Sequence, residues 1–200
     1  MSIYPQDPAF RSVSVGLKFS TDASGSDNGY QQAVSRDGAM IEIDAKYNKL
    51  SYAEAMRIRA FLVGLRGKAK TCDLILPVES HTVGDIAGSI IQADALTAGG
   101  SNSLAFKNGQ PNKTLRIAGE YIQLAGHDKT YMLTSDLVTD ATGAGTATFE
   151  PALYSQVLEN EQIIIDEIVF KVSASSDIIK TDLQPGKQYS FSVKFTEAIR

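Results

Sequence analysis

His127 and His81 are the only histidines of this 200-residue chain, and imidazoles are the commonest general bases. His127 precedes Asp128, whose carboxylate could orient the imidazole for proton transfer. The catalytic partners that such a base needs are missing, and the setting is that of a turn between two strands, so we interpret His127 as structural. His81 has no cysteine or histidine at metal-ligand spacing, and we expect neither histidine to catalyse or to bind a metal ion.

The single cysteine, Cys72, lies in a short apolar segment, where a lone thiol usually behaves as a small buried hydrophobe. Lys68 and Lys70 could instead lower its pKa and make it reactive. We favour the core position. A single cysteine also excludes an internal disulfide and a cysteine-cluster zinc site.

The other common catalytic and cofactor motifs are missing from the sequence. It contains no nucleophile elbow and no phosphate-binding loop, and Gly143-Ala-Gly145 lacks the third glycine of a dinucleotide fingerprint. The carboxylate pairs, Glu42 with Asp44 and Asp166 with Glu167, are interpreted as solvated surface, because nothing indicates a shared cleft. We therefore predict no enzymatic activity, no cofactor and no metal site.

Between positions 57 and 70 the sequence has one basic cluster, which comprises Arg57, Arg59, Arg66, Lys68 and Lys70. It could contact an acidic partner, or it could be a solvated helix face that complements the helix dipole. The whole chain has a net charge of -4 and a pI near 5.2, which gives no general attraction to nucleic acid or anionic lipid. The proline-containing start lacks an apolar run, so we expect neither a secretory signal nor a membrane anchor.

The elements that must position these residues begin with strands. Ser12 to Ser20 alternates apolar and polar residues, which is typical of a half-buried strand. Ser20 to Tyr30 is rich in turn formers and predicts a long exposed loop. Asp37-Gly38 predicts a tight hairpin turn between a strand at Gln31 to Ser35 and a strand at Ala39 to Tyr47.

A helix is expected to start at Ser51, because Ser51 and Glu54 have the spacing of a capping box. Its apolar stripe recurs at steps of three and four residues through Ala55, Ile58, Leu62 and Leu65. Gly67 can supply a left-handed stop. Thr71 to Leu76 then predicts a short strand that ends at Pro77.

After Pro77 short apolar pieces alternate with turn residues, which favours a small barrel or sandwich. The candidate strands are Ser89 to Ala93, Ser103 to Lys107, Thr114 to Ile117, Tyr121 to Leu124, Thr130 to Thr134, Thr146 to Glu150 and Glu167 to Ser173. Tyr189 to Phe195 alternates like the first strands and needs a partner sheet. We therefore predict a mainly β, α+β fold: residues 1–77 with 185–200 form one domain, interrupted by an inserted β-barrel of residues 78–184.

Three segments occur in a characteristic order: Tyr47 to Gly67 running on to Leu74-Ile-Leu-Pro77; Ile117 to His127 with Ala147-Thr-Phe-Glu-Pro-Ala-Leu153; and Tyr189 to Ile199. Together they resemble the distal tail proteins (Dit-like proteins) of long-tailed phages. The resemblance covers most of the chain outside Ser20 to Tyr30 and Ser155 to Gln184. Cys72-Asp73 stands where such proteins tend to carry an aromatic residue, and the chain has no tryptophan.

The resemblance implies an antiparallel, sandwich-like tail-ring domain with an inserted OB-like barrel. It implies a structural virion protein, made in the host cytoplasm, that forms a homohexameric ring and joins the tail tube to the tail-tip or baseplate hub protein. A subunit or partner interface is expected at Arg57, Arg66, Lys68, Lys70, Tyr121 and Tyr131. The alternative is a carbohydrate-binding module for the host surface, suggested by the short barrel strands and by Tyr121, Tyr131 and Tyr154, which we expect to be exposed.

Overall fold

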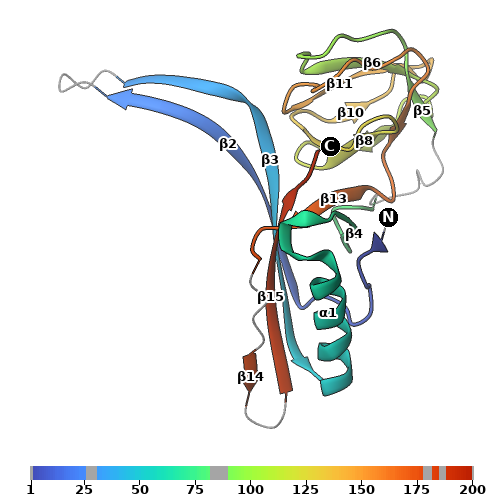
Figure 1. Ribbon diagram of the computed structural model, residues 1–200. Helices are drawn as coiled ribbons and strands as arrows, with labels where there is room; N and C mark the ends of the chain where they lie inside the picture. Colours follow the sequence, from blue (N-terminus) through green and yellow to red (C-terminus); the bar gives the residue numbers. More distant parts are fainter. Residues whose placement is uncertain (1, 26–30, 82–89, 178–181, 185–187, 200) are drawn as a thin grey trace.

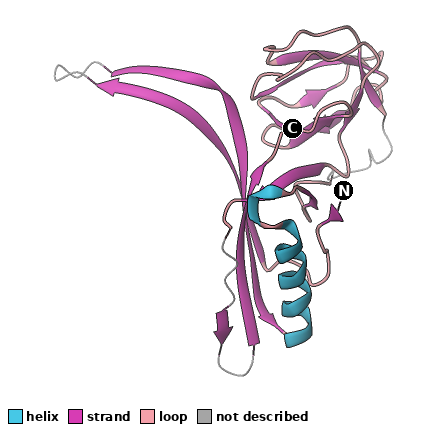
Figure 2. Ribbon diagram, viewed as in Figure 1, coloured by secondary structure: helices cyan, strands magenta, loops and turns pink. Residues whose placement is uncertain are grey.

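The computed structural model describes residues 2–25, 31–81, 90–177, 182–184 and 188–199. Within them the chain forms a seven-stranded sheet with one α-helix packed on it, and a closed barrel beyond the end of that helix (Figures 1 and 2). The predicted mainly β, α+β class is confirmed. No helix among these residues is long and apolar enough to cross a membrane.

The seven-stranded sheet gathers strands from both ends of the chain, in the order β1-β4-β13-β15-β3-β2, with β14 added beside β15. Only β1 and β4 run parallel; the other pairs are antiparallel. The strands are β1 (Ser2–Ile3), β2 (Ser12–Gly25), β3 (Gln31–Leu50), β4 (Cys72–Ile75), β13 (Val169–Ala174), β14 (Asp182–Gln184) and β15 (Gln188–Glu197).

Helix α1 (Tyr52–Leu65) begins as the sequence predicts. The amide of Ser51 donates to Glu54 Oε2 at 2.8 Å, and the Glu54 amide donates to Ser51 Oγ at 3.4 Å. The predicted apolar stripe is buried against the sheet. The left-handed stop involves Arg66 as well as Gly67, since both have positive φ, and a short 3₁₀ turn, η1 (Gly67–Ala69), follows.

The predicted loop and hairpin turn of the first half are wrong. Strand β2 continues to Gly25 and pairs with β3 from Gln31 onward, and residues 26–30 lie outside the described residues. Asp37-Gly38 makes a bulge inside β3: Lys18 pairs with Met40 and Ser20 with Arg36, so extra residues of β3 face Phe19. Gly38 has φ 117°, which a bulge exploits as readily as a tight turn does.

Beyond this bulge, β2 and β3 bend away from the sheet as a two-stranded ribbon, which we call the arm (Figure 1). The arm consists of Ser20–Gly25 paired with Gln31–Arg36. Below the bulge, β15 pairs with β3 from Glu42 onward and makes that part of β3 internal to the sheet. In the arm itself, no further described strand pairs with either edge.

The inserted domain is a closed barrel of strands in the order β11-β6-β5-β12-β8-β9. A small ribbon of β7 and β10 lies beside it. The strands are β5 (Ile91–Ala93), β6 (Ser103–Lys107), β7 (Thr114–Arg116), β8 (Tyr121–Leu124), β9 (Thr130–Leu133), β10 (Leu137–Val138), β11 (Gly145–Glu150) and β12 (Gln162–Ile164). Strands β10 and β12 have no counterpart among the predicted strands, and the part of the predicted Ser89 to Ala93 strand at Ser89 lies outside the described residues.

The insertion ends earlier than predicted. The predicted boundaries assign β13 to the inserted domain, but β13 pairs with β4 on one side and with β15 on the other. Its buried side chains, Phe170 and Val172, belong to the core of the sheet. Strands β13 and β14 therefore return to the first domain. Alternation reveals which face of a strand is buried but not which strand lies next to it.

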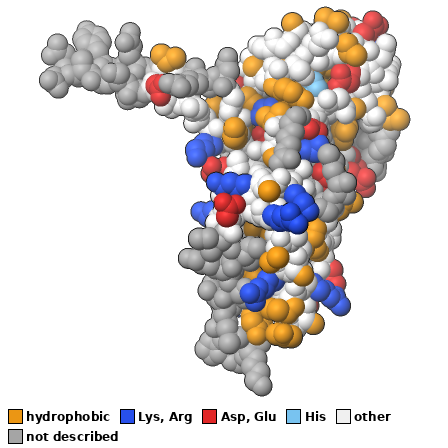
Figure 3. All heavy atoms as spheres, viewed as in Figure 1, with side chains coloured by type: hydrophobic (Ala, Val, Ile, Leu, Met, Phe, Trp, Pro, Cys, Tyr) orange, Lys and Arg blue, Asp and Glu red, His pale blue; other side chains and the backbone are white. Residues whose placement is uncertain are grey.

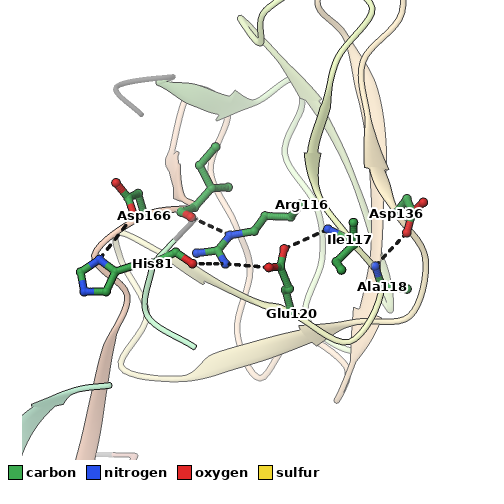
Figure 4. A network of polar contacts seen from close by, with 8 residues as sticks. His81, Arg116, Ile117, Ala118, Glu120, Asp136 and Asp166 are labelled. Carbon is green, nitrogen blue, oxygen red and sulfur yellow. Dashed lines mark hydrogen bonds and ion pairs between the residues drawn. The ribbon is translucent and has the colours of Figure 1, made fainter. Parts of the chain in front are cut away.

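Arg116 fixes the two connections between the sheet and the barrel (Figure 4). Its Nε donates to the carbonyl of Ile165 at 2.7 Å, and its Nη1 donates to the carbonyl of His81 at 2.9 Å. Glu120 Oε1 lies 3.5 Å from Nη1 and balances the charge of this buried guanidinium. His81 precedes the barrel and Ile165 follows it, so one side chain of β7 binds both crossings.

Candidate functional site

The expected interface residues divide into two groups in the structure. Arg57, Arg66, Lys68 and Lys70 are exposed. Tyr121 and Tyr131 are buried, at 6% and 0% exposure, so the prediction that they are exposed at a partner surface is wrong.

The two buried tyrosines serve the interior. Tyr121 packs edge-on against Phe170, with ring centroids 5.3 Å apart, and so joins the barrel to the core of the sheet. The Tyr131 hydroxyl lies 2.7 Å from His127 Nδ1 inside the barrel. Sequence periodicity marks such residues as belonging to strands, but in a short closed barrel both faces of a strand can be covered. Of the three tyrosines, only Tyr154 is exposed.

The basic cluster is spread over two places. Arg57 lies in the middle of α1, whereas Arg66, Lys68 and Lys70 gather just after its end. Nine residues at 1.5 Å per residue separate Arg57 from Arg66 by about 14 Å along the helix. Among the described residues no ion pair holds these four side chains, although the backbone amide of Lys68 donates to Asp177 Oδ1 at 3.1 Å. Their charges are therefore available to a partner.

A second polar surface lies on the face of the sheet opposite α1. Lys18 lies 3.1 Å from Glu42, and Lys194 lies 3.8 Å from Asp44, so opposite charges face one another across neighbouring strands. Figure 3 shows acidic and basic side chains side by side on the surface below the arm. Glu42 and Asp44 are thus paired surface groups, and this face carries charge of both signs.

His127 has the structural position that the sequence favours. It is buried, its Nδ1 meets the Tyr131 hydroxyl, and its Nε2 lies 3.1 Å from Ser155 Oγ. Asp128 does not orient this ring: its carboxylate binds Lys171 of β13 instead. This contact is one more tie between the barrel and the sheet.

Cys72 is buried in β4, and burial raises the pKa of its thiol to about 12. The neighbouring lysines do not activate it, because Lys68 and Lys70 are exposed while Cys72 faces the core. The described residues contain no cluster of three or more histidine, cysteine or carboxylate side chains that could hold a metal ion.

A buried ion pair joins the two domains, and no sequence pattern indicated it. Lys129 Nζ donates to Glu197 Oε2 at 2.9 Å and to the carbonyl of Ala39 at 2.7 Å. Glu197 Oε1 accepts from the amide of Thr130 at 2.9 Å. Lysine is almost always exposed, and it is fully buried almost only where it is paired. A lysine in a turn is therefore expected at the surface, and nothing in the sequence marks Lys129 as interior. The pair connects the barrel, the bulge and the last strand.

A cleft of about 630 Å³ opens beside this ion pair, between the root of the arm and the barrel. We call it the arm-root cleft. Phe19, Gly38 and Ala39 line it from the arm side, and Ile199 and Lys129 also line it. The barrel contributes Gly100, Asn102 and the run Glu150, Pro151, Ala152, Leu153 and Tyr154. The only sequence signals toward it were the Phe-Glu-Pro segment and the expectation that Tyr154 is exposed.

Neither a scan against models of protein families nor a search of curated proteins matches this chain.

Proposed function

We propose that this chain is a structural protein of a long-tailed phage. In this proposal it closes into a six-membered ring at the distal end of the tail and joins the tail tube to the tail-tip or baseplate hub protein. It acts by assembly and not by catalysis, and it is found in the virion after synthesis in the host cytoplasm. The order of the three segments that resemble distal tail proteins supports the family.

The arm is the observation that carries the assembly proposal. A two-stranded ribbon is marginally stable by itself in water, and the arm has no third strand among the described residues. Its unpaired edges are templates for another chain. Strand β2 also forms the outer edge of the seven-stranded sheet along its whole length. A second copy that covers such an edge stabilises both molecules.

The positions of these surfaces support the proposed ring. The arm leaves the body on one side, and α1 lies on another part of the molecule (Figure 1). Arg57 lies in this helix, and Arg66, Lys68 and Lys70 follow its end. Contacts between unlike surfaces are heterologous, and they close into a ring when the rotation per subunit divides a full turn. The mixed-charge face below the arm offers additional complementarity.

The test compares the mass of the full chain with that of an arm-shortened variant. Six copies of the 21.5 kDa chain give about 129 kDa. Ser20 and Arg36 are cross-strand partners, so an Asn-Gly turn can replace residues 21–35 without disturbing the bulge. We expect the full chain to form rings, alone at high concentration or with the tube protein, and the shortened chain to remain a folded monomer. A full chain that stays monomeric and does not bind the tube protein would refute the proposal.

A further inference from the structure

The arm-root cleft has the size and the mixture of groups of a small-molecule site. Its volume of about 630 Å³ lies within the roughly 300–1,000 Å³ typical of ligand pockets. Such pockets combine apolar walls with a few placed polar groups. Here the apolar walls include Phe19, Leu153 and Ile199, and the polar groups come from Asn102 and Glu150.

Tyr154 supplies an aromatic ring that is fixed before any ligand arrives. Its side chain is 45% exposed, yet its ring packs edge-on against His127, with centroids 4.7 Å apart and planes at 62°. His127 is in turn held by Tyr131 and Ser155. A ring braced in this way loses little conformational freedom on binding. The buried histidine therefore has a positioning role at this cleft.

Asn102 and Glu150 place a donor and acceptors side by side in the same cleft. Asn102 Nδ2 donates to Glu150 Oε1 at 2.7 Å, so the two side chains hold one another in position. The remaining Asn102 N–H, its amide oxygen and Glu150 Oε2 can still bind a ligand. Lys129 adds no free positive charge, because Glu197 pairs with it.

We propose that the arm-root cleft binds a neutral sugar unit of a glycan. A pyranose presents an apolar C–H face, which can stack on Tyr154, and hydroxyls that both donate and accept, which match the Asn102–Glu150 pair. The Glu150 carboxylate opposes anionic ligands such as phosphates or acidic sugars. The cleft is built by one copy of the chain, so this inference goes beyond the proposed ring and does not depend on it.

The test is saturation-transfer NMR on the full chain with chitotriose, maltotriose and mannotriose, and with sialyllactose as an anionic comparator. We expect at least one neutral trisaccharide to bind, with a dissociation constant on the order of 1 mM, and sialyllactose to bind more weakly. Tyr154→Ala and Asn102→Ala should each weaken that binding about tenfold. Tyr52→Ala is the matched control, because Tyr52 is also exposed but lies at the start of α1; it should bind like the unaltered chain.

Failure of all three neutral sugars to bind would overturn the inference, and so would binding that neither cleft variant weakens. Protection of Tyr154 in assembled rings, together with absent sugar binding, would show that a second copy fills the cleft and would also overturn it. The arm-shortened chain keeps Phe19, Gly38 and Ala39, so it should remain monomeric and still bind the sugar. If the full chain binds a sugar but forms no rings, alone or with the tube protein, only the proposed function is refuted. Rings of the full chain that bind no sugar refute only this inference.

Discussion

Lys129 attaches the barrel to the sheet through a buried ion pair. Its side chain and that of Glu197 are each only 2% exposed, and their two charged groups lie 2.9 Å apart. Removing one partner of such a pair leaves an uncompensated charge in the interior, and this costs far more than the pair contributes while intact. The ion pair thus makes the position of the barrel on the sheet sensitive to a single substitution.

Lys129→Met should lower the free energy of unfolding by about 3–5 kcal/mol, because the Glu197 carboxylate is then buried without its cation. Adding Glu197→Gln should restore part of this loss, since the neutral amide still accepts from the Thr130 amide. Urea unfolding of the two single variants and the double variant forms a double-mutant cycle. Strict additivity of the two changes would contradict the pairing.

Cys72 gives a prediction about pH. Burial raises the pKa of its thiol from 9.0 to about 12, so the folded protein holds the neutral form. This stabilisation is complete below pH 9 and is lost as the pH rises toward 12, because only the unfolded chain ionises over most of that range. Burial also raises the pKa of Tyr4 to about 12, which adds to the same decline.

We expect Ellman's reagent at pH 8 to leave the native thiol unmodified and to react fully once the protein is denatured. Unfolding midpoints measured from pH 8 to pH 11 should fall less steeply in Cys72→Ala than in the unaltered chain. Rapid modification of the native protein would mean that Cys72 is accessible, which its burial in β4 does not allow.

Residue types predicted the behaviour of the candidate site only where local chemistry decides it. The interior position of Cys72 and the structural role of His127 follow from a lone thiol in an apolar strand and a histidine in a turn. The burial of Tyr121 depends on Phe170, which lies 49 positions later in the sequence and in another domain. The arm-root cleft likewise joins residues from Phe19 to Ile199, and no local pattern contains such a contact.

Among the elements, α1 has the clearest local cause. Both hydrogen bonds of its capping box are present, and hydrogen bonds from Ser51 lower the pKa of Glu54 below its ordinary value. The box satisfies amides that the first turn of a helix leaves without partners. The signal for the start of the helix is therefore contained in the four consecutive residues Ser51 to Glu54.

Ser51→Ala should lower the free energy of unfolding by about 1 kcal/mol, the usual effect of losing a helix cap. Ser51→Thr is the matched control, because its hydroxyl can still accept from the Glu54 amide and donate to the Glu54 carboxylate, as Ser51 Oγ does at 2.7 Å. Thermal unfolding followed by circular dichroism measures the stability of each variant, and equal stability of Ser51→Ala and Ser51→Thr would contradict the capping role.

The strand predictions succeeded where alternation is long and failed where one signal fits two structures. The alternation of Ser12 to Ser20 and of Tyr189 to Phe195 correctly identified β2 and β15. Asp37-Gly38 tolerates the positive φ that both a hairpin turn and a bulge require, so the dipeptide alone could not distinguish them. The turn-forming residues of Ser20 to Gly25 predicted a loop, although they form a strand in the arm. Their pairing depends on the opposite strand, which the local composition does not reveal.

At the scale of the whole molecule, the barrel is an insertion whose two ends meet. The amide of Ile168 donates to the carbonyl of Ser80 at 2.9 Å, although the whole barrel lies between them in the sequence. In a β-turn the amide of the fourth residue often donates to the carbonyl of the first in this way. Two linking residues between Ser80 and Ile168 would make these two residues the first and fourth of such a turn. A two-residue Asn-Gly linker can therefore replace residues 81–167 and join β4 directly to β13.

This barrel-less variant should fold, because nearly all of the sheet core comes from the sheet strands and α1. Its melting temperature should be lower, since Tyr121, Met132 and Ile164 no longer pack on that core and Glu197 loses Lys129. The Lys129→Met, Glu197→Gln double variant of the full chain removes the ion pair without leaving a buried charge, so any larger loss in the barrel-less variant measures the lost packing.

If the arm and the sheet edge make the ring, as proposed, the barrel-less chain should still assemble, and it should bind none of the neutral trisaccharides. Circular dichroism tests the folding and the melting temperature, and light scattering tests the assembly. A folded barrel-less chain that remains monomeric while the full chain forms rings would place the ring contacts on the barrel instead.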